Sequence, residues 1–109
     1  MNSASAQADA TRALLLKLWQ RSLPLLRERL ALLHAAATAA HTGTLSTDLR
    51  ARAIDEAHKL TGSLGMFGYP DGTDIARKIE LLLEAPGAPP PDHFTELVTE
   101  LRAILFPPS

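Results

Sequence analysis

Hydrophobic positions recur along the chain at steps of three and four residues, which is the spacing of one face of an α-helix. Four stretches show this period, and none alternates with the two-residue period of a strand. The pattern predicts a first helical region over residues 11–41, a second helix over 47–68, a third ending near Ala85 and a last one ending before Pro107. In the second stretch the apolar stripe consists of Leu49, Ala53, Ala57, Leu60, Leu64 and Phe67.

Pro24 interrupts the first helical region. A proline is tolerated in the first turn of a helix, and Ser22 stands just before it as a possible N-cap. Two arrangements remain open: a short leading helix followed by a long one, or a single kinked helix. Trp19 lies near this joint, either as a core aromatic or as part of a docking surface.

Turn and capping residues set the other boundaries. Gly43 is a candidate for the residue after the first helical region, and Ser46 or Thr47 is expected to cap the second helix. The run 70–72 reads Pro-Asp-Gly and predicts a turn, after which Asp71 or Thr73 caps the third helix. The proline-rich run 86–91 predicts a semi-rigid loop, with Asp92 as the cap of the last helix.

The connections are short, and short connections favour antiparallel neighbours. The sequence therefore predicts an all-α protein, an up-and-down antiparallel four-helix bundle with a short additional N-terminal helix. Residues 1–10 are rich in alanine and serine without an apolar period, so we expect a flexible N-terminus there and a single domain over 11–109.

Composition excludes several functional classes. The 109 residues carry a formal net charge of −1 with arginine and glutamate interspersed, which argues against nucleic acid as a ligand. Lys17 breaks the apolar run at Leu14–Leu16 far short of the ~20 residues that a membrane span needs. The chain has no cysteine, which is compatible with a cytoplasmic protein. A monomer is expected.

The chemistry-bearing stretch is 57–69, in the second helix. Gly62 lies one turn after His58 and Gly65 two turns after it, so no bulky neighbour shields the imidazole. At about 100° per residue, His58 lies roughly 150° from the centre of the apolar stripe and is expected to face solvent. Each interior glycine costs about 1 kcal/mol relative to alanine, and close approach by another surface is a reason to retain it.

These residues resemble the signature of the histidine phosphotransfer (HPt) domains of phosphorelays and of the chemotaxis kinase. The family has a phosphorylatable histidine, an apolar residue two positions later, small residues at four and five, and glycines at seven and ten. The corresponding residues here are His58, Leu60, Gly62, Ser63, Gly65 and Gly68. The lysine that is common three residues after the histidine is Thr61 in this chain, while Lys59 directly follows His58. The resemblance implies a four-helix bundle.

A histidine that carries a phosphoryl group needs one ring nitrogen free and the other held as N–H by an acceptor. Counting back along an antiparallel third helix places Glu80 within a turn of His58. The resemblance indicates the same residue, because chemotaxis-type domains carry a glutamate 22 residues after the histidine. Glu80 is therefore expected to accept from Nδ1–H, which leaves Nε2 as the nucleophile.

Two cations are candidates for stabilising the phosphoryl group. Lys59 is placed ahead of Arg77, and the alternative for both is an ordinary solvated charge, with Asp74 pairing to Arg77 or Lys78 on its own helix. Partner docking is expected at Gly62 and Gly65, flanked by Ile54 and Thr61.

No metal site or cofactor is expected. His34, His41 and His93 lack ligands at metal-binding spacing, and no nucleophile elbow or phosphate-binding loop occurs. The resemblance implies a phosphocarrier rather than an enzyme, without a nucleotide site of its own. Its partners would be a histidine kinase and a response-regulator receiver domain. The alternative is a helical adaptor that binds receivers, or itself, without carrying phosphate.

Overall fold

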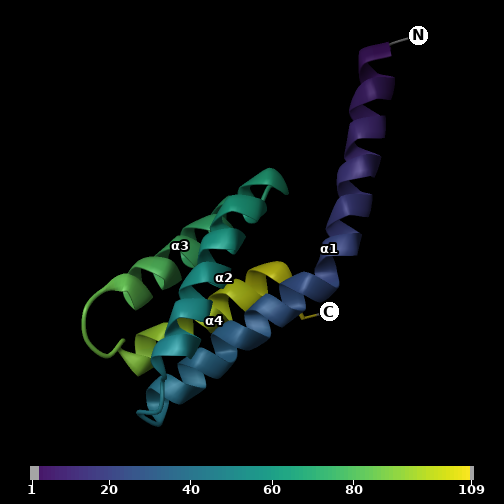
Figure 1. Cartoon of the computed structure of the whole chain (residues 1–109). Helices are drawn as coiled ribbons and strands as arrows, with labels where there is room; N and C mark the ends of the chain where they lie inside the picture. The colour runs from purple at the N-terminus through teal and green to yellow at the C-terminus, as the bar shows by residue number, and fades with distance from the viewer. Residues whose placement is uncertain (1–2, 109) are drawn as a thin grey trace.

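The computed structural model describes residues 3–108, which contain four α-helices and no strand. The helices are α1 (Ser3–His41), α2 (Thr47–Met66), α3 (Pro70–Glu84) and α4 (Pro91–Leu105). Each helix packs against two neighbours, since α1 and α3 each contact both α2 and α4 (Figure 1). The predicted all-α, up-and-down bundle is confirmed.

The core consists of the apolar faces that the sequence pattern predicted. Leu60 and Leu64 of α2, Ile79 and Leu83 of α3, and Phe94 of α4 are fully buried. From α1 the buried residues are Leu26, Leu30, Leu33, Ala36 and Ala37, all in its C-terminal half. Removing these side chains from water supplies the main driving force for the bundle.

The N-terminal region differs from the expectation. Helix α1 begins at Ser3, earlier than the helix start expected near Thr11, while the flexible N-terminus expected over residues 1–10 stays a prediction; Met1 and Asn2 lie outside the described residues. Residues 3–18 are all exposed, and Figure 1 shows this part of α1 projecting beyond the other three helices. The alanine-rich sequence explains the helix, because alanine has the highest helix propensity.

Within residues 3–108 no separate leading helix is present, because α1 continues through Pro24 as one helix that changes direction (Figure 1). Of the two arrangements left open, the kinked helix is the observed one. Pro24 has no N–H and therefore leaves the carbonyl of Gln20 without its helical donor. Ser22 does not cap a helix: its hydroxyl donates to the Leu18 carbonyl at 2.8 Å, a bond that often accompanies helix bending.

Helix boundaries were predicted best where a side chain caps the helix. Ser46 caps α2 by accepting from Leu49 N–H at 3.1 Å, as predicted. The predicted caps Asp71, Thr73 and Asp92 are wrong, because α3 and α4 begin at Pro70 and Pro91 without a side-chain cap. Proline fits a first helical position since the N–H that it lacks would have no helical partner there.

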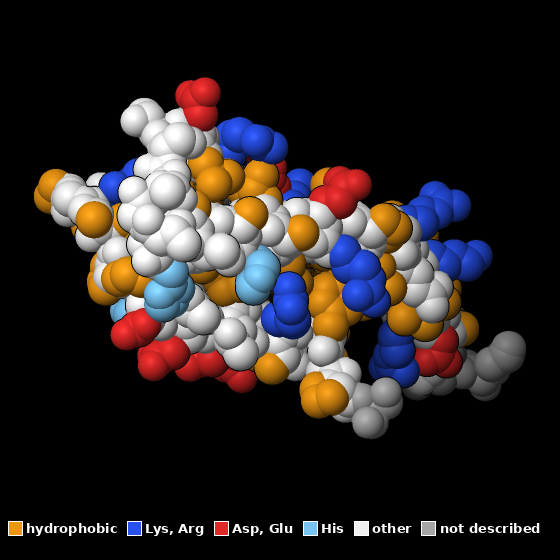
Figure 2. All heavy atoms as spheres, turned by 90° about the horizontal axis from the view of Figure 1, so that it is seen from below, with side chains coloured by type: hydrophobic (Ala, Val, Ile, Leu, Met, Phe, Trp, Pro, Cys, Tyr) orange, Lys and Arg blue, Asp and Glu red, His pale blue; other side chains and the backbone are white. Residues whose placement is uncertain are grey.

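The surface carries mixed charge. On the face drawn in Figure 2, most lysine and arginine side chains lie at the centre and right, separated by hydrophobic ones, while acidic side chains gather mainly at the lower left, so no continuous basic stripe is seen. Over residues 3–108 no helix has both the length and the apolar character required to cross a membrane.

Candidate functional site

The site lies where α2 and α3 pack side by side. His58 projects from α2 with 73% of its side chain exposed, whereas Glu80 of α3 is only 15% exposed. The two residues are 22 positions apart, and His58 Nδ1 lies 2.8 Å from Glu80 Oε2. The contact expected from the sequence is therefore present.

The direction of this hydrogen bond follows from its acceptor. An ionised carboxylate can only accept, so in the neutral imidazole Nδ1 carries the proton and donates it to Glu80. The lone pair of the neutral ring is then on Nε2. The exposed side chain gives a partner access to that nitrogen, and the half-buried carboxylate fixes the orientation of the ring.

The glycines after His58 keep the neighbouring surface open. A Cβ atom added at Gly62 would meet no other atom within 4 Å, and one added at Gly65 would lie 3.8 Å from Thr73 Oγ1 on α3. Thr61 is half-buried and donates its hydroxyl to the Ala57 carbonyl at 3.0 Å. Ile54 packs partly against the core. The two glycines, Thr61 and Ile54 all lie on α2 within about two turns of His58.

Lys59 faces away from that surface. Its Nζ lies 2.9 Å from Asp55 and 3.8 Å from Glu56, both on α2. The hydrogen bond and negative charge of Asp55, with the charge of Glu56, raise the pKa of Lys59 above its ordinary 10.5. The residue that follows His58 is thus already paired with two carboxylates.

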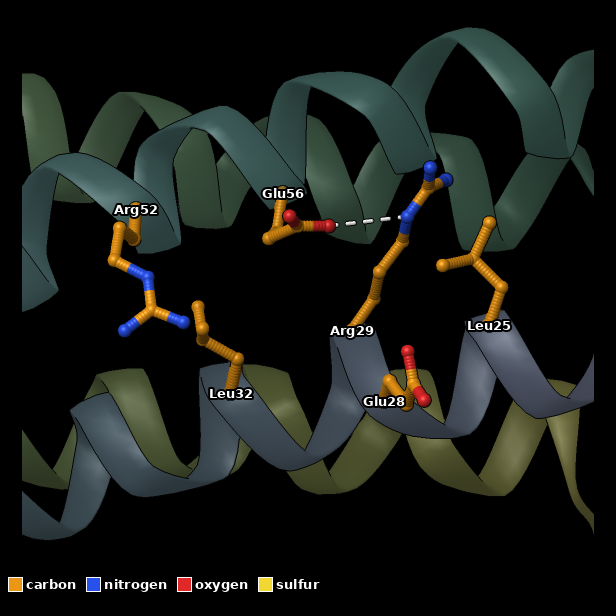
Figure 3. Close-up of a pocket in the computed structure, with 6 residues that line it drawn as sticks. All are labelled: Leu25, Glu28, Arg29, Leu32, Arg52 and Glu56. Atoms are coloured by element: carbon orange, nitrogen blue, oxygen red, sulfur yellow. Dashed lines mark ion pairs between the residues drawn. The ribbon is translucent and has the colours of Figure 1, made fainter.

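This ion-pair group continues to α1. Arg29 Nε lies 3.0 Å from Glu56 Oε2 across the α1–α2 groove (Figure 3). The N–H is not aligned for a hydrogen bond despite this separation, so the contact is ionic rather than directional. Sequence reasoning missed the group, although the i, i+4 spacing of Asp55 and Lys59 was a readable signal for its first pair.

Arg77 and Lys78 differ from Lys59, which is ion-paired within α2. Both are exposed on α3, and within residues 3–108 neither forms an ion pair or a side-chain hydrogen bond. The alternative in which Asp74 pairs with one of them is therefore not observed. Arg77 lies one turn before Glu80, so of these two cations it is the one on the same side of α3 as Glu80.

Three aromatic residues close the end of the bundle beyond the glycines. Trp19 of α1 stacks on Tyr69 with centroids 4.8 Å apart and meets Phe67 edge-on at 5.2 Å. Trp19 is thus partly buried at the end of the core, which agrees with the first of the two interpretations of this residue.

Comparison with protein-family models finds one that matches residues 17–105, described as the Hpt domain. This match spans far more than half of the chain. The chain belongs to the histidine phosphotransfer (Hpt) domain family. A search of the curated proteins and a search of the solved structures each found no match.

Family membership confirms the resemblance drawn from the histidine stretch. Hpt domains are phosphocarrier modules of phosphorelays, in which they interact with kinases and receiver domains. The histidine of this Hpt domain that faces solvent beside a carboxylate at hydrogen-bond distance is His58. Among the residues that the structure describes, no cluster of three metal-binding side chains occurs.

Proposed function

We propose that this Hpt domain accepts a phosphoryl group on Nε2 of His58 and exchanges it with the aspartate of a receiver domain. The observation that carries the proposal is the 2.8 Å contact between Nδ1 and Glu80. It selects the tautomer whose nucleophilic nitrogen is Nε2 and holds the ring in one orientation.

The transfer step follows from this tautomer. The Nε2 lone pair attacks the phosphorus of the aspartyl phosphate, a P–N bond forms, and the P–O bond breaks with its electron pair leaving on the aspartate carboxylate. Positive charge develops on the ring because Nδ1 keeps its proton. The Glu80 carboxylate lies next to that proton and stabilises the developing charge, and the reverse sequence returns the phosphoryl group.

Arg77 is the better candidate for stabilising the phosphoryl oxygens. Lys59 would have to leave Asp55 and Glu56 to reach them, whereas Arg77 has no ion pair to break. The open surface over Gly62 gives a long guanidinium side chain room to approach a group on His58. The sequence analysis placed Lys59 ahead of Arg77 for this role, and the proposal reverses that order.

The partner would dock over the glycines. Gly62 and Gly65 let a receiver come close to the imidazole, and Ile54 and Thr61 flank the contact. Nucleotide and Mg²⁺ would be bound by the kinase and receiver partners rather than by this chain. The proposal places the protein with those partners in the cytoplasm.

The test is transfer of label from a receiver domain phosphorylated with ³²P. The chain is expected to become labelled, with a label that is lost in acid, and His58→Gln is expected to abolish it. His93→Gln is the matched control, because His93 is also exposed, on α4. Label that persists in His58→Gln would show that the site is assigned wrongly.

A helical adaptor that binds receivers without carrying phosphate is the second candidate. The observation in its favour is that Lys59 is tied to carboxylates while Thr61 occupies the place of the common lysine. An adaptor would bind the receiver in a pull-down and remain unlabelled. Binding without acid-labile label would therefore replace the first proposal with this one.

A further inference from the structure

Exposed large hydrophobic side chains are concentrated on α1. Of the seven in the described chain, five lie on this helix: Leu14, Leu15, Leu16, Leu18 and Leu25. The other two, Met66 and Leu81, lie on α2 and α3. Scattered exposed leucines are ordinary, but a concentration on one projecting helix is typical of an interaction surface.

Four leucines of α1 form a line of their own. Leu14, Leu18, Leu25 and Leu32 follow at steps of four, seven and seven residues. At about 100° per residue they lie within roughly 40° of one another around the helix, and the buried leucines of α1 lie roughly 100° away. Leu32, at the C-terminal end of the line, is half-buried and also packs against the core. We call these four residues the second leucine seam. A seven-residue apolar repeat is the pattern by which one helix packs along another.

The two ends of this seam have different surroundings. Leu14 and Leu18 lie on the half of α1 that projects from the bundle, where they are 58% and 39% exposed. Leu25 and Leu32 instead line a hollow of about 180 Å³ in the α1–α2 groove, together with Arg52 and Glu56 (Figure 3). One end thus offers protruding side chains and the other offers a groove.

The charges beside the seam are arranged about its middle. Arg21 precedes Leu25 by four residues and Glu28 follows it by three, and both lie on the same flank, roughly 40–60° from Leu25. Within residues 3–108 neither Arg21 nor Glu28 forms an ion pair. In an antiparallel pair of helices related by a two-fold axis, residues on the same flank meet, so opposite charges at such positions are self-complementary.

We propose that the chain forms a homodimer in which the α1 helices of two copies pack antiparallel along the second leucine seam. The two-fold axis passes close to Leu25, so that Leu25 meets its own copy and Leu18 meets Leu32 of the second copy. The same register brings Arg21 opposite Glu28 of the second copy. The projecting half of each α1 then lies along the α1–α2 groove of the other bundle.

This dimer leaves the phosphotransfer site accessible. Arg52, which lines the groove, and His58 lie about 120° apart around α2, and Glu80 lies on α3, away from α1. A dimer would therefore present two separate imidazoles. This proposal departs from the monomer that the sequence analysis expects.

The first experiment measures the molecular mass by sedimentation equilibrium over a wide range of protein concentration. The wild-type chain is expected at about twice 11.7 kDa. Leu18→Gln and Leu25→Gln are expected to shift it to the monomer mass, while Leu81→Gln, a matched exposed leucine on α3, leaves the dimer intact. A monomer at every concentration would overturn the proposal. Circular dichroism checks that each variant is helical.

The second experiment tests the antiparallel register by exchanging charges. Arg21→Glu and Glu28→Arg each place like charges opposite one another twice in the dimer, and each is expected to raise its Kd about tenfold. The double variant restores both pairs and is expected to restore the Kd. In a parallel dimer Arg21 would face its own copy, so single variants that do not weaken association, or a double variant that stays weak, would exclude this register.

Discussion

His58 and Lys59 are adjacent in the sequence, but their side chains lie on different sides of α2 and have different surroundings. Toward α3, His58 is largely exposed, and its Nδ1 lies at hydrogen-bond distance from Glu80. Toward α1, Lys59 joins Asp55, Glu56 and Arg29 in a chain of alternating charges. Successive residues of a helix point about 100° apart, so a position next to the histidine in sequence belongs to another surface. In the proposed function the side with His58 is available for phosphotransfer, whereas the charges on the other side are engaged in ion pairs.

The largest expected effect on the α3 side is that of Glu80. Glu80→Ala removes both the orientation and the charge and is expected to slow phosphotransfer about 10–100-fold, the worth of a hydrogen bond to a charged group. Glu80→Gln keeps an acceptor oxygen and is expected to lose less, since neutral hydrogen bonds are about half as strong. Stopped labelling reactions with a phosphorylated receiver measure both rates. Equal rates for the two variants would show that the carboxylate charge has no role.

The open surface at Gly62 can be closed without disturbing the fold. Gly62→Leu is expected to slow phosphotransfer about tenfold, because the added side chain stands where the partner approaches. Gly62→Ala meets no atom and is expected to raise the free energy of unfolding by about 0.5–1 kcal/mol. Thermal unfolding followed by circular dichroism gives the second value. If Gly62→Leu transfers at the wild-type rate, the partner does not dock there.

The two cations provide a direct comparison of the two sides of α2. Arg77→Gln is expected to slow phosphotransfer about fivefold through loss of a charge-assisted contact to the phosphoryl oxygens. Lys59→Gln is expected to change it less than twofold, since Lys59 is held by Asp55 and Glu56. The same labelling reaction compares the variants. A larger effect for Lys59→Gln would make Lys59 the better candidate for stabilising the phosphoryl group.

The smallest expected effect is a pH dependence of the free energy of unfolding that arises from the ion pair between Lys59 and Asp55. The pKa of Lys59 is raised in the folded state, so its contribution to stability is complete below pH 10.5 and is lost as pH rises through the folded pKa. Wild-type chain should therefore be slightly more stable than Asp55→Asn at neutral pH, and the difference should vanish in strong alkali. Urea unfolding at both pH values measures it. A difference that persists in alkali would assign it to another group.

The sequence predicted correctly those features that depend on the spacing of residues within one helix. The buried positions of all four helices follow the apolar period, and Ser46 caps α2 through a contact only three residues away. It failed at Pro70 and Pro91, where proline at the first helical position replaced the expected side-chain caps. The short additional N-terminal helix in the predicted fold was also wrong, because a bent helix and two separate helices leave the same pattern around Pro24.

The sequence by itself determined that the chain is helical, that His58 faces away from the core, and that Glu80 reaches its level across an antiparallel pair. These follow from the period of the helix and the lengths of short connections. Only the tertiary structure decided that Arg29 of α1 joins Glu56 of α2 in an ion pair, and that half of α1 projects from the bundle with its leucines exposed. Such outcomes depend on which neighbouring surface a side chain meets, and residues 27 positions apart, such as Arg29 and Glu56, meet only once the helices have packed.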